Sequence, residues 1–430
     1  MTTELQSIAY KAKTHPEHRF SNLSQLLDED LFYQSWGKLK KDAAPGVDGL
    51  TAKDFKQNLS LNVSTLVDEL RTGRYRAESV KRIHIPKANG KTRPLGLPTV
   101  KDKLCQHGVA TVLNHIWEQD FLPYSYGYRP QKSAHGAVVS LCANVQYGRF
   151  GYAVEADIKG FFDTVNHDML KEMLAQRIDD KRLLRLIGQW LKSKTVEGGQ
   201  VSESTGKGTP QGSSISPVLA NIYLHNVLDL WFEHMVKPKL KGKAMLIRYA
   251  DDFVVTFQYR NDAVRFYKAL PKRLSKYGLE VAPEKTRLMR LSRFHPGKER
   301  SFIFLGFNFY WDIDRNGNAR FRRKTAKAKQ KFTMKNFTEW IKKYRHTKLK
   351  YLLPKLKRKI VGFSNYFGLV DNSVSLAQVY DHVLHSLFKW LNRRSGKRSC
   401  NWCQLKQKLA AYAIIAPKVR KSKIKIDWYC

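Results

Sequence analysis

The chain has 430 residues, of which 42% are hydrophobic, and its formal net charge is +40. This length supports about two or three domains with their own cores, and no apolar run reaches the roughly 20 residues of a membrane-spanning helix. So large a positive excess favours a polyanionic partner, and we expect nucleic acid rather than a membrane. The N-terminus has neither a signal-peptide core nor a transit pattern, so we expect a cytoplasmic protein.

After a mostly helical beginning, alternating residues predict two strands, Val80–Pro86 and Thr92–Leu97, around a turn at Asn89-Gly90. Lys87 and Arg93 flank this turn, where two cations are placed to converge on one anion such as a triphosphate. The alternative is a pair of solvated surface cations. Helical periodicity predicts further helices over residues 101–120, 167–175 and 181–192.

A short acidic turn is the most informative feature of the chain. Residues 249–252 read Tyr-Ala-Asp-Asp between two apolar runs, which predicts a β-hairpin that presents Asp251 and Asp252 at its turn. Adjacent carboxylates repel each other, and divalent cations remove that cost. A predicted strand over residues 152–158 carries a third carboxylate, Asp157, near its end. Three carboxylates at adjacent strand ends suit two Mg²⁺ ions about 4 Å apart, the arrangement used for in-line phosphoryl transfer.

A loop rich in Gly and Pro occupies residues 208–217 and leads into an apolar helix expected over residues 218–227. Backbone amides at the start of such a helix bind a phosphate or a base. The alternative is a simple capped loop, since Ser216 before Pro217 is itself favourable N-cap chemistry.

The positive charge is concentrated in the last quarter, because residues 315–430 hold 30 Lys and Arg against 4 Asp and Glu. Before it, a ribbon over residues 301–310 is expected to return at residues 319–322 through a turn at Asn316-Gly317. A helix follows whose apolar stripe we assign to core packing: Leu356, Ile360, Phe363 and Phe367. Its polar face faces either phosphate or water, and we favour phosphate: Lys355, Lys357, Arg358 and Lys359.

The five cysteines are scattered, which favours a reducing compartment over a disulfide framework. Cys400 and Cys403 have the spacing of zinc ligands, but no second Cys or His pair lies nearby in the sequence, so a zinc site is disfavoured.

Four motifs together resemble those of reverse transcriptases in order and spacing: residues 85–96, 156–163, 209–212 and 249–252. Further segments are similar to the branch encoded by group II introns: residues 45–49, 125–135, 304–307 and, more loosely, 390–399. The resemblance covers about residues 30–400 and implies an α+β, right-hand polymerase fold. It implies an N-terminal segment (1–30), an N-terminal extension with fingers (31–150), an antiparallel palm with inserted finger elements (151–314) and a basic helical thumb or maturase domain (315–430).

The resemblance also implies roles for individual residues. Two Mg²⁺ ions, with Mn²⁺ as a substitute, are bound mainly by Asp157 and Asp251, with the Ile158 carbonyl assisting and Asp252 nearby. The dNTP-binding residues are expected to be Lys87, Arg93, Phe162, Gln211 and Lys285. Among them, Phe162 excludes a ribose 2′-hydroxyl and Lys285 neutralises or protonates the leaving pyrophosphate; ordinary core packing and a plain surface lysine are the alternatives. The expected primer grip is Phe304, Leu305, Gly306 and Phe307. The expected nucleic-acid contacts are Lys355, Arg358, Lys359, Arg393, Arg394, Lys397 and Arg398.

Three functional hypotheses follow. The first is an RNA-directed DNA polymerase of a compact group II intron, which also binds intron RNA to assist splicing and retrohoming. Its partners are an RNA template, intron RNA, a DNA primer or target and dNTPs. The second is mainly an RNA-binding splicing cofactor, against which the intact carboxylates argue. The third is a domesticated relative in phage defence or DNA repair. Because Cys400 and Cys403 lack the second pair and the histidines of an HNH nuclease, we do not expect DNA cleavage.

Overall fold

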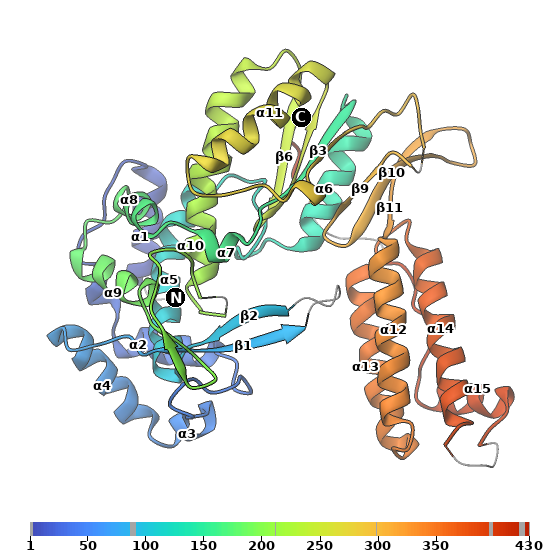
Figure 1. Cartoon of the computed structure of the whole chain (residues 1–430), viewed down its shortest axis with the longest axis horizontal. Coiled ribbons are helices and arrows are strands. Elements are labelled where there is room, and N and C mark those ends of the chain that lie inside the picture. The colour runs from blue at the N-terminus through green and yellow to red at the C-terminus, as the bar shows by residue number, and fades with distance from the viewer. Residues whose placement is uncertain are drawn as a thin grey trace.

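The computed structural model describes residues 3–86, 92–210, 212–297, 299–394, 399–420 and 426–429. Figure 1 shows the shape of a right hand, with fingers at the left, a palm at the top and a helical thumb at the right. This is the fold class expected from the motifs.

The N-terminal part is helical, as predicted. Its helices are α1 (Thr3–Thr14), α2 (Glu29–Lys38), α3 (Ala52–Gln57), α4 (Leu59–Thr72) and α5 (Val100–Asp120). Side chains that accept from backbone N–H groups of the first turn fix three of the starts: Asp28 for α2, Thr51 for α3 and Thr99 for α5. The long helix α5 is buried along much of its length and packs against α1, α2 and α4, so it forms the centre of the fingers.

A four-stranded sheet with the order β2-β1-β4-β5 extends from this helical base. Its strands are β1 (Val80–Pro86), β2 (Thr92–Leu97), β4 (Thr195–Glu197) and β5 (Gln200–Ser202). The β1–β2 hairpin has the predicted bounds and points towards the thumb (Figure 1). Helices α8 (His167–Ala175) and α9 (Lys181–Leu191) also match their predicted ranges.

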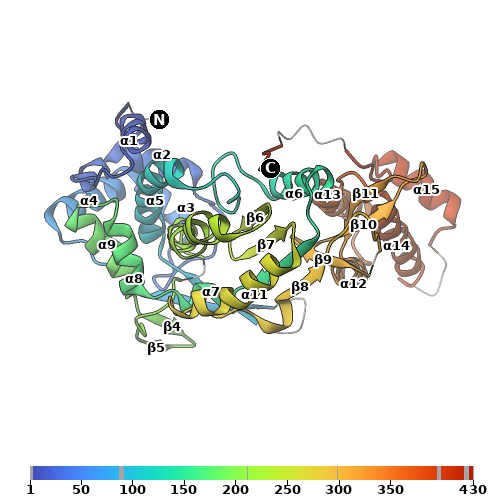
Figure 2. The same cartoon turned by 90° about the horizontal axis from the view of Figure 1, so that it is seen from above.

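The palm is an antiparallel sheet with the order β6-β7-β3-β8. Its strands are β3 (Tyr152–Asp157), β6 (Ala244–Tyr249), β7 (Asp252–Phe257) and β8 (Arg287–Arg290). Helices α10 (Ser216–Leu224) and α11 (Arg260–Ser275) share a core with one face of this sheet, and α6 (Ala134–Tyr147) shares another core with the opposite face. Figure 2 shows α6 and α11 on the two sides of β6 and β7.

Two details of α10 differ from the sequence expectation. The helix begins at Ser216 with Ile215 as the N-cap residue, and the Ser216 hydroxyl donates instead to the Pro210 carbonyl (2.9 Å). Beyond Leu224 the helix continues through two π-helical turns, His225–Asp229 and Trp231–Val236. Such widened turns often occur at functional sites.

A second sheet, with the order β11-β10-β9, joins the palm to the thumb. The single ribbon strand expected over residues 301–310 is wrong, because the chain turns inside it. Strand β9 (Ser301–Phe304) ends before Leu305 and Gly306, both of which have positive φ (51° and 79°), and β10 (Phe307–Ile313) runs back. Strand β11 (Ala319–Thr325) pairs with β10 across the predicted Asn316-Gly317 turn.

The thumb is a bundle of α12 (Lys327–Tyr344), α13 (Leu349–Phe367) and α14 (Ser373–Leu391), to which α15 (Trp402–Ala411) adds. Leu356, Ile360 and Phe367 are buried, as expected for the stripe on α13. Among the described residues, no helix is long and apolar enough to cross a membrane.

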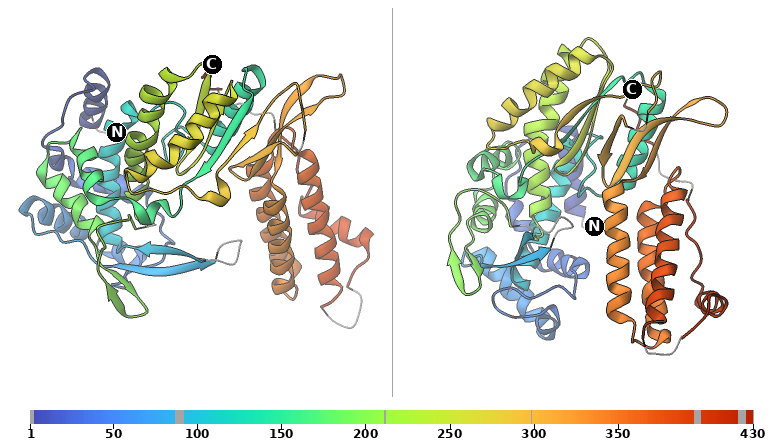
Figure 3. Two further views of the ribbon diagram at one scale, coloured as in Figure 1. Left: turned by 45° about the horizontal axis from the view of Figure 1, so that its top comes forward. Right: turned by 45° about the vertical axis from the view of Figure 1, so that its right-hand side comes forward.

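The C-terminal residues do not stay with the thumb. The Tyr429 amide donates to Asn144 Oδ1 (2.8 Å), and the Trp428 ring lies 5.9 Å from that of Tyr147, so residues 426–429 dock on α6. Figure 3 shows the C-terminus at the palm in both views. The thumb is therefore attached to the palm both before it, through the sheet of β9, β10 and β11, and after it, through residues 426–429.

Candidate active site

Strand register brings the three predicted carboxylates together at one end of the strands of the palm sheet. Asp157, the last residue of β3, pairs directly with Asp252, the first residue of β7. Asp251 occupies the two-residue turn between β6 and β7 together with Ala250, whose φ is 56°. The sequence predicted carboxylates at adjacent strand ends, and Asp157 does lie beside the 251–252 hairpin.

Burial and mutual repulsion destabilise the charged forms of Asp251 and Asp252. Burial, with Asp157, Asp251 and Glu155 nearby, raises the pKa of Asp252 to about 7. Burial also raises the pKa of Asp251, and Asp157 adds to this effect. The Lys285 ammonium lies 2.5 Å from Asp157 Oδ2, and this hydrogen bond raises the pKa of Lys285. A lysine cation thus stands where the site requires positive charge.

The residues present fit a divalent ion by chemistry, since carboxylate and carbonyl oxygens are the donors that Mg²⁺ prefers. In the part of the chain described, no three His, Cys, Asp or Glu side chains converge closely enough to hold an ion. Lys285 takes one oxygen of Asp157, and Asp252 accepts from the Leu305 amide at 3.4 Å. The bridge between Ile158 and Val281 uses the carbonyl of Asp157, so the Ile158 carbonyl lies outside that pairing.

Two of the predicted dNTP-binding residues, Lys87 and Gln211, lie outside the described residues. Arg93, on β2, is close enough to Asp251 to oppose the rise in its pKa. Phe162 is 7% exposed and packs edge-on to Phe161 (5.4 Å between ring centroids), so it is largely a core residue.

The remaining surface of Phe162 lines a cavity of about 280 Å³ whose walls also include Arg82, Gly96 and Lys207. The predicted Gly- and Pro-rich loop forms part of the wall of this cavity. Its Thr209 amide donates to the Phe162 carbonyl (2.7 Å). This hydrogen bond therefore fixes the loop to α7 (Phe161–Thr164).

The predicted primer-grip residues form the tight turn between β9 and β10. Its backbone is attached to the palm sheet by two acidic side chains, since Glu155 accepts from the Ile303 amide (3.3 Å) and Asp252 from the Leu305 amide (3.4 Å). The Leu305 carbonyl accepts from the Tyr366 hydroxyl on α13 (3.0 Å). Phe304 and Phe307 are fully buried, so their side chains are core, whereas Leu305 is only partly buried. The backbone of this turn and the Leu305 side chain are therefore the parts placed to touch a primer.

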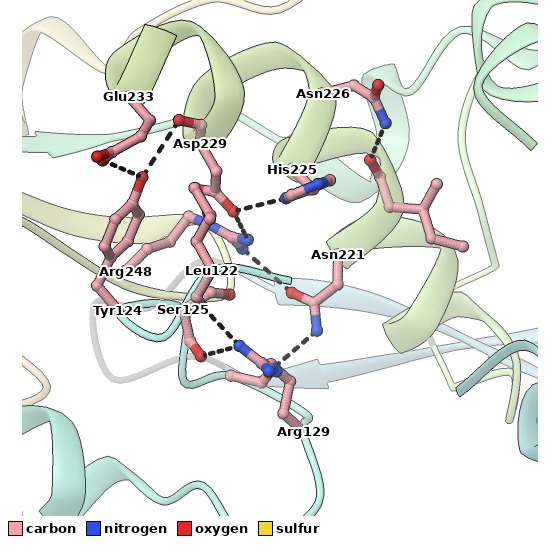
Figure 4. Close-up of polar contacts among 12 residues, drawn as sticks. Leu122, Tyr124, Ser125, Arg129, Asn221, His225, Asn226, Asp229, Glu233 and Arg248 are labelled. Carbon is pink, nitrogen blue, oxygen red and sulfur yellow. Dashed lines mark hydrogen bonds and ion pairs between the residues drawn. The ribbon is translucent and has the colours of Figure 1, made fainter. Parts of the chain in front are cut away.

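A polar network that the sequence motifs did not predict lies behind the turn at Ala250 and Asp251 and is drawn in Figure 4. At its centre Arg248, on β6, forms a bidentate ion pair with Asp229, and both side chains are 0% exposed. A second missed residue is Gly127, because a Cβ added to it would lie 2.3 Å from the Ala250 nitrogen. The sequence signal for Arg248 was an arginine inside an otherwise apolar strand.

Comparison with known families identifies the chain. The family model described as "Reverse transcriptase (RNA-dependent DNA polymerase)" matches residues 85–309, about half of the sequence. The chain belongs to the reverse transcriptase family. A second model, "Group II intron, maturase-specific domain", matches residues 319–409 of this reverse transcriptase. The two matches confirm the resemblance and favour an intron-encoded reverse transcriptase and maturase over the alternatives. Reverse transcriptases use divalent metal ions, RNA and DNA.

Individual relatives agree with this family. Protein YkfC of Escherichia coli is 28% identical over 356 residues, which cover 74% of this reverse transcriptase and 91% of YkfC. The group II intron-encoded protein LtrA of Lactococcus lactis is 35% identical over 228 residues, 52% of this chain and 37% of LtrA. The telomerase reverse transcriptase of Takifugu rubripes is 29% identical over 122 residues, 28% of this chain and 11% of that protein.

The predicted nucleic-acid contacts of this reverse transcriptase lie on the thumb, where Lys397 and Arg398 are outside the described residues. Lys355, Arg358 and Lys359 are exposed on α13. Arg393, just after α14, is exposed and lies 5.9 Å from the Trp390 ring. Arg394 is partly buried and donates to the Leu391 carbonyl (3.2 Å).

A second basic region, which the motifs did not predict, lies on the fingers. A cavity of about 1130 Å³ opens between α4 and α9. One acidic residue, Glu78, and seven cationic residues line it: Arg71, Arg76, Lys171, Arg182, Arg185, Lys192 and Lys194. This cavity is separate from the carboxylates, so its chemistry suits a polyanion rather than catalysis.

Proposed function

We propose that the chain copies RNA into DNA with two Mg²⁺ ions, or Mn²⁺ as a substitute, held by Asp157, Asp251 and Asp252 with help from the Ile158 carbonyl. The observation that carries this proposal is the pairing of Asp157 with Asp252 at the strand ends beside Asp251. When bound, the ions lower the pKa of the primer 3′-hydroxyl and stabilise the charge on the departing pyrophosphate.

The side chains around these strand ends position the reactants. The primer 3′-oxygen attacks the α-phosphorus of the dNTP, the bond to the β-phosphate oxygen breaks, and pyrophosphate leaves. Arg93 and Lys87 hold the triphosphate, and Lys285 meets the leaving pyrophosphate once it releases Asp157. Gln211 supports the incoming nucleotide. The exposed edge of Phe162 limits room at the ribose 2′ position. The backbone at residues 304–307 places the primer end.

We further propose that residues 31–150 act as the N-terminal extension and fingers, 151–314 as the palm and 315–430 as the thumb, in a cytoplasmic protein. The thumb contacts bind the RNA–DNA duplex through Lys355, Arg358, Lys359, Arg393, Arg394, Lys397 and Arg398. The basic cavity between α4 and α9 supports a second RNA contact on the fingers, in keeping with a maturase that binds intron RNA.

Primer extension on an RNA template tests the polymerase. Purified protein with Mg²⁺ should extend a DNA primer on poly(rA)/oligo(dT), and Asp157→Asn should not. Extension by Asp157→Asn at the wild-type rate contradicts the assignment of the site.

Sequencing the RNA that copurifies with the protein tests the maturase role. Enrichment of a group II intron RNA, and faster splicing of that RNA when protein is added, are expected. Enrichment of unrelated RNA, with no ribozyme sequence flanking the gene, would favour a domesticated relative instead.

A further inference from the structure

The buried ion pair between Arg248 and Asp229 lies behind the turn at Ala250 and Asp251, which is the catalytic turn of the proposed function. Its guanidinium has several partners besides Asp229. Arg248 Nε donates to Asp229 Oδ1 (2.8 Å) and Nη2 to Oδ2 (2.5 Å). The remaining nitrogen, Nη1, donates both to the Asn221 amide oxygen and to the Ala250 carbonyl, each at 3.1 Å. One planar guanidinium therefore joins β6, α10, the π-helical turn and the catalytic turn.

The contact with Ala250 bears directly on the site. Ala250 has a φ of 56°, a left-handed conformation that is unfavourable for a residue with a Cβ. Its carbonyl belongs to the peptide group that leads into Asp251. Because Arg248 holds that carbonyl, it fixes the plane of the peptide group and with it the direction of the Asp251 side chain.

The other side of the turn is held through the same guanidinium. Asn221 accepts from Arg248 and donates through Nδ2 to the Gly127 carbonyl (2.7 Å). Gly127 lies against the Ala250 nitrogen, and the Tyr126 amide donates to the Arg248 carbonyl (2.8 Å). Arg248, Asn221, Gly127 and Ala250 thus form a closed ring of contacts, part of which Figure 4 shows.

A buried ion pair is a poor source of stability, because removing two charges from water costs about as much as their attraction returns. Burial opposes ionisation of Asp229, but Arg248 and His225 together outweigh it and leave the pKa of Asp229 below its ordinary value. What the pair provides is geometry, since a guanidinium carries its donors in a fixed plane and a lysine does not.

We propose that Arg248, anchored by Asp229 and Asn221, is a positioning residue that sets the catalytic turn for nucleotide addition. The proposal rests on the proposed polymerase function. It assigns the arginine before the Tyr-Ala-Asp-Asp string a role in catalysis through Asp251, without contact with the substrate.

The test separates stability from positioning by removing both charges together. Arg248→Met combined with Asp229→Leu replaces the pair with apolar side chains, which often preserves stability. We expect a melting temperature within a few degrees of wild type and unchanged affinity for template–primer. We expect the rate of nucleotide addition at saturating dNTP to fall about 100-fold, the usual cost of misplacing a reacting group by about 1 Å. A folded double variant with a rate within threefold of wild type overturns the proposal.

Arg248→Lys keeps a buried cation beside Asp229 and decides the matter if the double variant does not fold. A similar loss of rate is expected, because one ammonium cannot reach Asp229, Asn221 and Ala250 together; a wild-type rate overturns the proposal. Tyr124→Phe is the matched control. It removes a hydroxyl that donates to the Asp229 carbonyl (3.2 Å) and leaves every contact of the guanidinium in place, so its rate should be unchanged.

Terbium binding provides a readout independent of polymerase activity. Tb³⁺ at the carboxylates is excited through nearby tyrosine. Tyr249 directly precedes the turn, and the Tyr128 ring centroid lies 6.4 Å from that of Tyr249. Arg248→Lys should weaken Tb³⁺ affinity several-fold; unchanged affinity contradicts the positioning role. If wild-type protein binds Tb³⁺ but extends no primer, the proposed function fails while this comparison still tests the positioning of the turn.

Discussion

Gly127→Ala tests how tightly the catalytic turn is held. The added Cβ would lie 2.3 Å from the Ala250 nitrogen and 3.0 Å from the Tyr249 carbonyl carbon, both backbone atoms that cannot rotate away. Ordinary contact begins near 3.4 Å, so the two backbones must separate by about 1 Å. A displacement of that size at reacting groups costs about 100-fold in rate, or about 2.7 kcal/mol.

Single-turnover addition of one dNTP to a primer on RNA measures this effect, with template–primer affinity measured separately by fluorescence anisotropy. The rate constant should fall and the affinity should not. Gly37→Ala, on α2, is the matched control, because nothing lies within 4 Å of its added Cβ; it should keep the wild-type rate and gain up to about 1 kcal/mol of stability. A folded Gly127→Ala variant with a rate within threefold of wild type would refute the inference that this contact sets the turn.

Three further outcomes are expected. Asp251→Asn should abolish extension on poly(rA)/oligo(dT) while RNA affinity stays the same or rises slightly, because a negative charge is lost; retained extension contradicts the site. Phe162→Ala should increase incorporation of ribonucleotides relative to dNTPs in a competition assay, and unchanged selectivity would place the steric gate elsewhere. Replacing Lys355, Arg358 and Lys359 by Gln should reduce the slope of log affinity for RNA–DNA duplex against log salt by about 2 to 3, as three lost phosphate contacts require; an unchanged slope would move the main contacts to the fingers.

The sequence predicted those parts of the fold in which local pattern and tertiary packing agree. The bounds of β1, β2 and β3 follow from alternation and turn residues, and the acidic hairpin follows from two apolar runs around a tight turn. The ribbon over residues 301–310 was wrong because apolar residues continue on both sides of Leu305, so periodicity does not mark the turn.

The support of the site was harder to predict than the carboxylates themselves. Arg248 and Asp229 are 19 positions apart, and a charged residue gives no sequence sign that its partner will be buried with it. The π-helical turn that carries Asp229 has no compositional signature either. Gly127 was visible only as part of a motif, since its role depends on a backbone more than a hundred residues away.

The docking of residues 426–429 on α6 has a mechanical consequence for the thumb. Asp427 accepts from the Tyr126 hydroxyl (2.8 Å), and Tyr126 precedes the glycine that touches the Ala250 backbone. A large outward rotation of α12, α13 and α14 must therefore detach this docked segment or pull on the loop behind the Asp251 turn. The same few hydrogen bonds therefore resist opening of the hand to release a finished duplex and help to hold the reacting groups in register.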